Sequence, residues 1–226
     1  MKKYQIGPWP AALDPSLVEA ARSVEIATIG HFRHRGFMAT AMSPLGTVRG
    51  TLVGRAVTVA IPGPCSTLLH HAIGLLGEGD MLVIDRLGDG RHACLGGGVA
   101  RAIARTGAIG AIVGGPCTDP DEIAESGLSV WCTGIAPITT RLLDLGGSLN
   151  LPIACGGVPV MPGDVVLADS TGVLVMPPGE ALEAADEART REARSQARQA
   201  KLAKGMKLGD LSGASRMVQA DQDAAS

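Results

Sequence analysis

Short apolar runs alternate with helix-forming segments through the middle of the chain, and this alternation constrains the fold more than any other feature. AVTVAI and DMLVID have the length and residue types of buried strands, and Ser66 can cap a helix between them. The predicted strands cover residues 56–61, 80–85 and 109–113, and the predicted helices cover 66–76, 97–106 and 119–126. Strands and helices of this length in alternation favour an α/β layer with largely parallel strand pairing.

The segments on either side of this layer have different patterns. Residues 1–13 are expected to form an arm, and Asp14 followed by Pro15 predicts the start of a helix that runs to about Val24. After Gly127 the pattern changes to short strands and turns, and DVVLA and VLVM near its end predict a β-hairpin. The central sheet is therefore expected to be mixed.

The C-terminal part predicts a long helix. Residues 179–204 combine Ala, Glu and Arg with opposite charges at helical spacing, which is typical of a solvated surface helix or a subunit contact. Residues 209–226 are small and polar and are expected to fray. Because no linker or repeat is visible, we expect one domain over 1–226, with its core at about 25–178.

Composition excludes several classes of partner. The formal net charge is −2, which is too balanced for a general nucleic-acid binder, and aromatic residues make up only 2%, which leaves no base-stacking platform. No run approaches the roughly 20 apolar residues that cross a bilayer, and the start lacks the apolar stretch of a secretory signal. The five cysteines include no C-x-x-C pair, which favours reduced thiols. We expect a cytoplasmic protein with a small-molecule partner, and neither a membrane nor a nucleic acid.

Three consecutive glycines open the predicted helix 97–106. Gly96, Gly97 and Gly98, named here the glycine turn, precede a first helical turn whose backbone N–H groups are free and lie at the positive end of the helix dipole. Glycines let an anion approach the backbone closely. The glycine turn therefore predicts a cradle for a carboxylate or phosphate.

Two carboxylates follow the next strand within one helical turn of each other. Asp119 and Glu122 offer the oxygen ligands that Mg²⁺ prefers, at a strand end where ligands commonly gather. They predict a metal site beside the glycine turn. The alternative is a capped helix start, because Asp-Pro-Asp-Glu is also an ordinary sequence for that position.

Histidines are weaker candidates for site chemistry. His70 and His71 are adjacent on a predicted helix, so they point in different directions and make a poor metal pair. His31, His34 and His92 are candidates for acid–base chemistry because the unperturbed imidazole titrates near neutrality. A structural role is the expectation for each of them taken singly.

Five segments in a fixed order resemble a known family. They are TLVGRAVTVAIPGP, EGDMLVID, the glycine turn with its helix, GAIGAIVGG with TDPDE, and CGGVPVMPGDVVLADSTGVLVMPPGE. Together they span roughly Thr51 to Glu180 and resemble the RraA-like family, which includes 4-hydroxy-4-methyl-2-oxoglutarate and 4-carboxy-4-hydroxy-2-oxoadipate aldolases and the RraA inhibitors of ribonuclease E. The resemblance implies an α/β RraA-like layered fold and a homotrimer or hexamer with sites near subunit boundaries.

The resemblance also implies roles for individual residues. The family's aldolases carry a glycine, twenty intervening residues, then Arg-Asp, two residues, and Glu or Asp. Gly97 stands at the glycine, Asp119 at the aspartate and Glu122 at the final acid. The match implies that Asp119 ligates Mg²⁺ or Mn²⁺ and that Glu122 supports metal-bound water. It also implies that the glycine-turn amides hold a pyruvyl carboxylate.

Thr118 stands where the aldolases carry the arginine that braces the carbonyl end of the substrate. A hydroxyl is short and neutral, whereas a guanidinium is a charged, bidentate fork, and losing such a stabiliser typically lowers a rate by about 10²–10³. Arg33 or Arg35 is one candidate for the vacant role. Arg86 or Arg91, on the loop before the glycine turn, is another, and Arg91 is predicted to bind substrate.

We therefore expect a divalent-metal-dependent lyase-type enzyme, aldolase- or decarboxylase-like, that acts on a 2-oxo or 2-hydroxy polycarboxylate. The cation would polarise a carbonyl and stabilise an enolate, with Asp119, Glu122 and Thr118 as the catalytic residues. An isomerase on the same scaffold is an alternative because Thr118 alters the site. A non-catalytic regulator that binds a ribonuclease, as RraA does, is another: the missing arginine favours it, and the retained acids speak against it.

Overall fold

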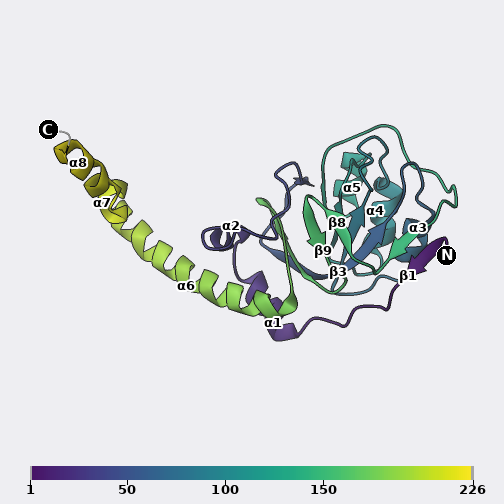
Figure 1. Ribbon diagram of the computed structural model, residues 1–226, viewed down its shortest axis with the longest axis horizontal. Coiled ribbons are helices and arrows are strands. Elements are labelled where there is room, and N and C mark those ends of the chain that lie inside the picture. Colours follow the sequence, from purple (N-terminus) through teal and green to yellow (C-terminus); the bar gives the residue numbers. More distant parts are fainter. Residues whose placement is uncertain (1, 225–226) are drawn as a thin grey trace.

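The computed structural model describes residues 2–224, and its centre is a mixed β-sheet (Figure 1). Four neighbouring strands form the parallel part of that sheet: β3 (Leu52–Ala60), β4 (Asp80–Asp85), β5 (Gly110–Val113) and β6 (Ser129–Cys132). Their carboxyl ends consequently lie along one edge. The predicted α/β layer with largely parallel pairing is confirmed.

Further strands extend the sheet in both directions. They are β1 (Tyr4–Ile6), β2 (Ser43–Leu45), β7 (Gly147–Leu149), β10 (Val165–Asp169) and β11 (Gly172–Met176). β10 and β11 form the predicted hairpin, and β10 also pairs antiparallel with β3. The expected arm contributes an edge strand, since β1 pairs in parallel with β7. A separate two-stranded sheet contains β8 (Ile153–Cys155) and β9 (Val158–Val160).

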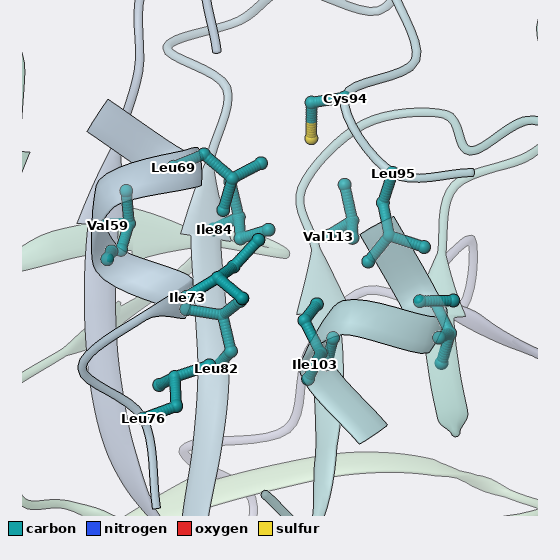
Figure 2. Close-up of a cluster of buried hydrophobic side chains, with 14 of the residues drawn as sticks. Val59, Leu69, Ile73, Leu76, Leu82, Ile84, Cys94, Leu95, Ile103 and Val113 are labelled. Carbon is teal, nitrogen blue, oxygen red and sulfur yellow. The ribbon is translucent and has the colours of Figure 1, made fainter. Parts of the chain in front are cut away.

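Three short helices cover one face of the parallel strands: α3 (Thr67–Ile73), α4 (Gly97–Ala104) and α5 (Pro120–Glu125). Figure 2 shows the apolar cluster between this face and the helices, in which Leu69, Ile84 and Ile103 are fully buried. Ser66 precedes α3 but makes no side-chain cap; its hydroxyl instead donates weakly, over 3.4 Å, to the carbonyl of Arg141. That contact comes from a distant loop and has no local sequence signal.

Three further helices pack against the β10–β11 hairpin. These are α1 (Pro15–Arg22), α2 (Ile26–Ile29) and α6 (Pro178–Ala203), which share a second apolar cluster with the hairpin. Asp14 caps α1 as predicted, because its Oδ1 accepts a hydrogen bond of 2.8 Å from the Ser16 N–H. A third cluster fills the space between the hairpin, β9 and the opposite face of the parallel strands.

The C-terminal helix extends away from this body (Figure 1). The buried residues of α6 all lie in its first half, between Ala181 and Ala188, and its second half is solvated. α7 (Leu208–Ser212) and α8 (Ala214–Ala224) follow. Within the described residues, the end that was expected to fray is thus helical, and residues 225–226 lie outside the description. None of the helices in the described range is both long enough and apolar enough to span a membrane.

A buried ion pair links the N-terminal segment to the sheet. Asp80 is fully buried, and its Oδ1 accepts a hydrogen bond of 2.5 Å from Arg55 Nε while its Oδ2 accepts one of 2.8 Å from the Gly77 N–H. Arg55 also donates to the carbonyl of Pro10 at 2.9 Å. Both ends of this pair are hydrogen-bonded, which is the condition under which a buried charge pair is tolerated.

Candidate functional site

The glycine turn forms the start of α4. Gly96 is the N-cap and has no side chain to cap the helix, and the first N–H that donates back into the helix is that of Ala100, to the Gly96 carbonyl at 2.9 Å. The N–H groups of Gly98 and Val99 precede this bond, so the helix leaves them without an acceptor. This arrangement agrees with an anion cradle at the positive end of α4.

Asp119 lies against the glycine turn. Its backbone is left-handed, with φ 50° and ψ 55°, and its side chain makes no cap of α5. Oδ2 instead accepts a long hydrogen bond of 3.4 Å from the Gly97 N–H. Non-glycine residues in this region are strained by about 1–3 kcal/mol, and such strain gathers at functional sites. Helix capping, the alternative role for Asp119, therefore does not explain why its side chain lies against the glycine turn.

The first two glycines have no room for a side chain. A Cβ at Gly96 would lie 2.6 Å from Thr118 Cγ2, and a Cβ at Gly97 would overlap the carboxylate and Cβ of Glu122. A Cβ at Gly98 would meet nothing within 4 Å. The structure thus brings the glycine turn together with residues about twenty positions further along the chain.

Thr118 and Glu122 have defined partners. The Thr118 hydroxyl donates to Asp119 Oδ1 at 3.2 Å, and the Thr118 N–H donates to the Leu95 carbonyl at 3.0 Å. Glu122 is exposed, and its Oε2 forms an ion pair of 2.7 Å with Arg101 of α4. Thr118 therefore orients Asp119, and Arg101 orients Glu122.

A loop crosses the carboxyl ends of the parallel strands. Residues 134–146, named here the strap, form isolated parallel bridges to the loops that follow β5, β4 and β3 in turn. The bridges pair Ile135 with Cys117, Thr139 with Ala93, and Arg141 with Cys65. The strap thus covers the strand ends although it has no regular secondary structure of its own.

A cavity of about 250 Å³ lies between the strap and the glycine turn. Its lining includes Gly96, Gly98, Thr118 and Asp119 from the predicted site. The other polar residues of its lining are Ser66, His70, Thr139, Thr140 and Arg141, none of which the sequence had assigned to the site. Thr139, Thr140 and Arg141 belong to the strap, and only its tertiary bridges bring them to the site. Ser66 and His70 come instead from the start of α3, four residues apart.

The histidine pair on α3 contributes one residue to this cavity. His70 and His71 are both exposed, and only His70 lines it. Adjacent helical residues point in different directions, as expected.

Arg33 and Arg35, the first candidates for the role of the missing arginine, lie away from the glycine turn. Arg33 and Arg35 both bind Glu180 at the start of α6, with N–O distances of 2.6 Å and 2.9 Å. They line a larger hollow of about 1110 Å³ against α6, which also contains His34. Within one chain, neither arginine reaches the glycine turn.

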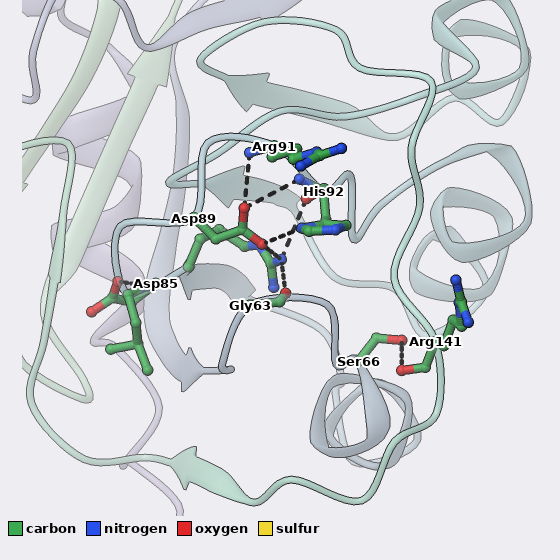
Figure 3. Close-up of polar contacts among 9 residues, drawn as sticks. Gly63, Ser66, Asp85, Asp89, Arg91, His92 and Arg141 are labelled. Carbon is green, nitrogen blue, oxygen red and sulfur yellow. Dashed lines mark hydrogen bonds and ion pairs between the residues drawn. The ribbon is translucent and has the colours of Figure 1, made fainter.

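Arg86 does not face the glycine turn, contrary to expectation. Its side chain is fully buried, and Nη2 donates to the Gly63 carbonyl at 2.5 Å and to Asp89 at 3.1 Å. His92 shares the same carboxylate, with its Nδ1 2.9 Å from Asp89 Oδ2 (Figure 3). Arg91 is exposed, donates its backbone N–H to Asp89, and is not part of the cavity lining. These residues form a structural cluster that fixes the loop after β4.

The Cys117 thiol, beside Thr118, is poorly placed for a nucleophile. Cys117 is fully buried, and its hydrogen bond with Cys132, followed by burial, raises the pKa of its thiol. A thiol held in its neutral form is unreactive. All five cysteines are buried free thiols.

The donor set suits a cation with few protein ligands. Within residues 2–224, no group of three or more His, Cys, Asp or Glu side chains is placed to hold a metal ion. Asp119 is the one acidic side chain in the described lining of the cavity, and Glu122 lies beside it across the glycine turn. Mg²⁺ commonly keeps several waters and takes only one or two carboxylates together with its substrate. The residues present therefore fit such an ion.

Comparisons with known proteins agree on a family. The RraA-like family model, described as Aldolase/RraA, matches residues 15–175, more than half of the chain. A protein of Halalkalibacterium halodurans named "Putative 4-hydroxy-4-methyl-2-oxoglutarate aldolase" is 30% identical over 148 residues, which are 66% of this chain and 70% of that protein.

Solved structures of RraA proteins share the fold. Streptomyces coelicolor RraAS2, described as an unusual member of the RNase ES inhibitor RraA protein family, aligns with a TM-score of 0.75 and 29% identity. The alignment covers 85% of this chain and 99% of that one. The RNA-processing inhibitor RraA from Thermus thermophilis aligns with a TM-score of 0.57 and 27% identity, over 62% of this chain and 84% of its own. On the family match and these shared folds, the chain belongs to the RraA-like family.

Proposed function

We propose that this protein is a divalent-cation-dependent lyase that cleaves a carbon–carbon bond in a 2-oxo or 2-hydroxy polycarboxylate. The observation that carries the proposal is Asp119, which stands in a left-handed conformation over the glycine turn and lines the cavity beneath the strap. The aldolase name of the Halalkalibacterium halodurans relative supports an oxo acid as the substrate.

Each residue of the proposed site has a physical role. The amides of Gly96, Gly97 and Gly98, at the positive end of α4, bind the carboxylate next to the 2-oxo group. The Gly97 N–H is available to it because its contact with Asp119 Oδ2 is long, at 3.4 Å. Asp119 holds the cation, and Thr118 orients Asp119 through its hydroxyl. A Mg²⁺ or Mn²⁺ ion bound there would polarise the substrate carbonyl. The proposed site does not include Arg91, which lies outside the cavity lining.

Glu122 is the proposed acid–base residue. Its carboxylate lies beside the glycine turn and is oriented by Arg101, so it can hold a water molecule next to Asp119. Such a water can carry a proton to or from the substrate, which is general acid–base catalysis by a positioned carboxylate.

We further propose that the chain is one domain that forms a homotrimer or hexamer in a reducing cytoplasm. The strap supports assembly because it exposes large apolar side chains beside the cavity, namely Ile135, Ile138, Leu142, Leu143 and Leu145. A second copy that covered them would also close the site. The buried free thiols support a reducing compartment. Light scattering of the purified protein measures the assembly directly.

A non-catalytic regulator of a ribonuclease is the second candidate. It is supported by the similarity to RraAS2 and by the absence of an arginine at position 118. Affinity capture from lysate discriminates the two functions. A stoichiometric ribonuclease partner, with no turnover of any oxo acid, supports the regulator.

Asp119→Asn tests the lyase proposal without disturbing the backbone, because asparagine tolerates the left-handed conformation. In this variant we expect Mg²⁺ and Mn²⁺ to lose their effect on the unfolding temperature and turnover to disappear. Wild-type turnover and metal dependence in the variant would contradict the assignment.

A further inference from the structure

The proposed substrate carries more negative charge than the glycine turn can bind. A 2-oxo polycarboxylate has one carboxylate beside its oxo group and at least one more at a distance. The helix N-terminus and the cation at Asp119 account for the first carboxylate only. Thr118 is neutral, so a second positive group is needed elsewhere in the cavity.

Half of the ten arginines that precede α6 are held by carboxylates. Those in ion pairs, with their partners, are Arg33 and Arg35 with Glu180, Arg55 with Asp80, Arg86 with Asp89, and Arg101 with Glu122. Arg141 differs from all of them. It lines the cavity together with Asp119, and within residues 2–224 it forms no ion pair.

The backbone of Arg141 is fixed although its side chain is exposed. Its N–H donates to the Pro64 carbonyl at 2.7 Å, and its carbonyl accepts from the Ser66 N–H at 2.9 Å. Figure 3 shows the Arg141 side chain beside Ser66 and well apart from the cluster around Asp89 and His92. The strap therefore presents a guanidinium without an ion-pair partner in residues 2–224, on a backbone held by two hydrogen bonds. Because this backbone is already ordered, less entropy is lost when the guanidinium binds a ligand.

We propose that Arg141 binds the second carboxylate of the substrate and so selects oxo acids that carry one. This inference rests on the lyase function proposed above and names its substrate class more closely. A guanidinium binds a carboxylate through two parallel hydrogen bonds, which makes the contact specific as well as strong. In this chain the discriminating arginine comes from the strap instead of position 118.

Two acids of the same length provide the test. 2-Oxoglutarate and 2-oxopentanoate both have five carbons and a 2-oxo acid end, and only the first has a distal carboxylate. Calorimetric titration with Mg²⁺ present should show that wild type binds 2-oxoglutarate about ten- to hundred-fold more tightly, as expected for a charge-assisted hydrogen bond. Arg141→Ala should abolish this preference and leave 2-oxopentanoate binding unchanged. Arg141→Lys should restore part of it, because lysine keeps the charge without the fork.

A matched control and the contrary outcomes complete the experiment. Arg105→Ala removes an exposed arginine at the other end of α4 and should keep the full preference. An unchanged preference in Arg141→Ala, an equal weakening of both acids, or loss of the preference in His70→Ala alone would overturn the inference. If wild type binds neither acid, the lyase function itself fails; if wild type binds both and Arg141→Ala changes nothing, only this inference fails.

Discussion

Gly96 and Asp119 lie so close together that a side chain at Gly96 would place its Cβ 2.6 Å from Oδ2 of Asp119. The backbone of Gly96 is extended and accessible to any residue, so glycine is required here by the close approach and not by the conformation. The position of the Asp119 carboxylate therefore requires glycine at position 96.

Gly96→Ala should displace Asp119 and lower turnover by about a hundred-fold, since a shift of about 1 Å in a catalytic group can have this effect. Overpacking should also lower the free energy of unfolding by about 1–3 kcal/mol. Steady-state kinetics and urea unfolding measure the two effects. Gly179→Ala, where the added Cβ meets nothing within 4 Å, is the control. It should leave turnover unchanged and should not lower the free energy of unfolding, since alanine is favoured over glycine within a helix. Full activity in Gly96→Ala would show that the contact does not position Asp119.

Glu122→Gln should lower turnover by about 10²-fold or more, because it removes the carboxylate that is proposed to hold the water and move the proton. Stability should change by less than about 1 kcal/mol, since the ion pair with Arg101 is exposed. Arg101→Gln breaks the same ion pair but keeps the carboxylate, so it should retain more activity than Glu122→Gln. Equal losses in the two variants would mean that Glu122 acts only as a partner of Arg101.

Asp80→Ala should lower the free energy of unfolding by about 3–5 kcal/mol, because it leaves the nearly buried guanidinium of Arg55 without its counter-charge. Urea unfolding followed by circular dichroism measures the loss. The double variant Asp80→Ala with Arg55→Met should recover part of it, since the uncompensated charge is gone. A loss below about 1 kcal/mol in the single variant would contradict the account of this pair.

Glu180 should make stability depend on pH. Its hydrogen bond with Arg33, and then the charges of Arg33 and Arg35, hold the pKa of its carboxyl below the ordinary value of 4.5. An acid whose pKa is lower in the folded state contributes stability above the unfolded pKa and loses it as the pH falls through the folded pKa. The unfolding temperature of wild type should therefore exceed that of Glu180→Gln at pH 7, and the difference should shrink below about pH 4.5. Glu183→Gln, which removes a carboxylate without an ion pair in the described residues, should show no such trend. A difference that grows on acidification would refute the mechanism.

Much of the layer and part of the site could be predicted because their signals are local. β4 spans 80–85 as predicted, because a short apolar run bounded by acidic residues is typical of a buried strand. The glycine turn, Asp119 and Glu122 come together because a parallel strand–helix–strand unit places successive strand ends along one edge.

The remainder depends on contacts between distant residues. Arg33 and Arg35 looked like candidates for the site, but their partner Glu180 lies about 145 positions away, so no local pattern indicated that they form ion pairs. The strap has no periodicity, and its place over the cavity follows from bridges to three separate loops. Arg141 could not be singled out until these bridges were known.

The most direct test of the central claim is pyruvate release from oxaloacetate and from 4-hydroxy-4-methyl-2-oxoglutarate, with Mg²⁺ and with EDTA, in wild type and Asp119→Asn. Both reactions form the enolate of pyruvate, which a bound cation would stabilise. Oxaloacetate reaches it by loss of CO₂, whereas 4-hydroxy-4-methyl-2-oxoglutarate must also give up the proton of its 4-hydroxyl group to a base. We predict release by wild type with Mg²⁺ from at least one substrate, and none with EDTA or in Asp119→Asn. Absence of release from both substrates by a folded wild-type protein, or release that survives EDTA and the loss of Asp119, would contradict the account.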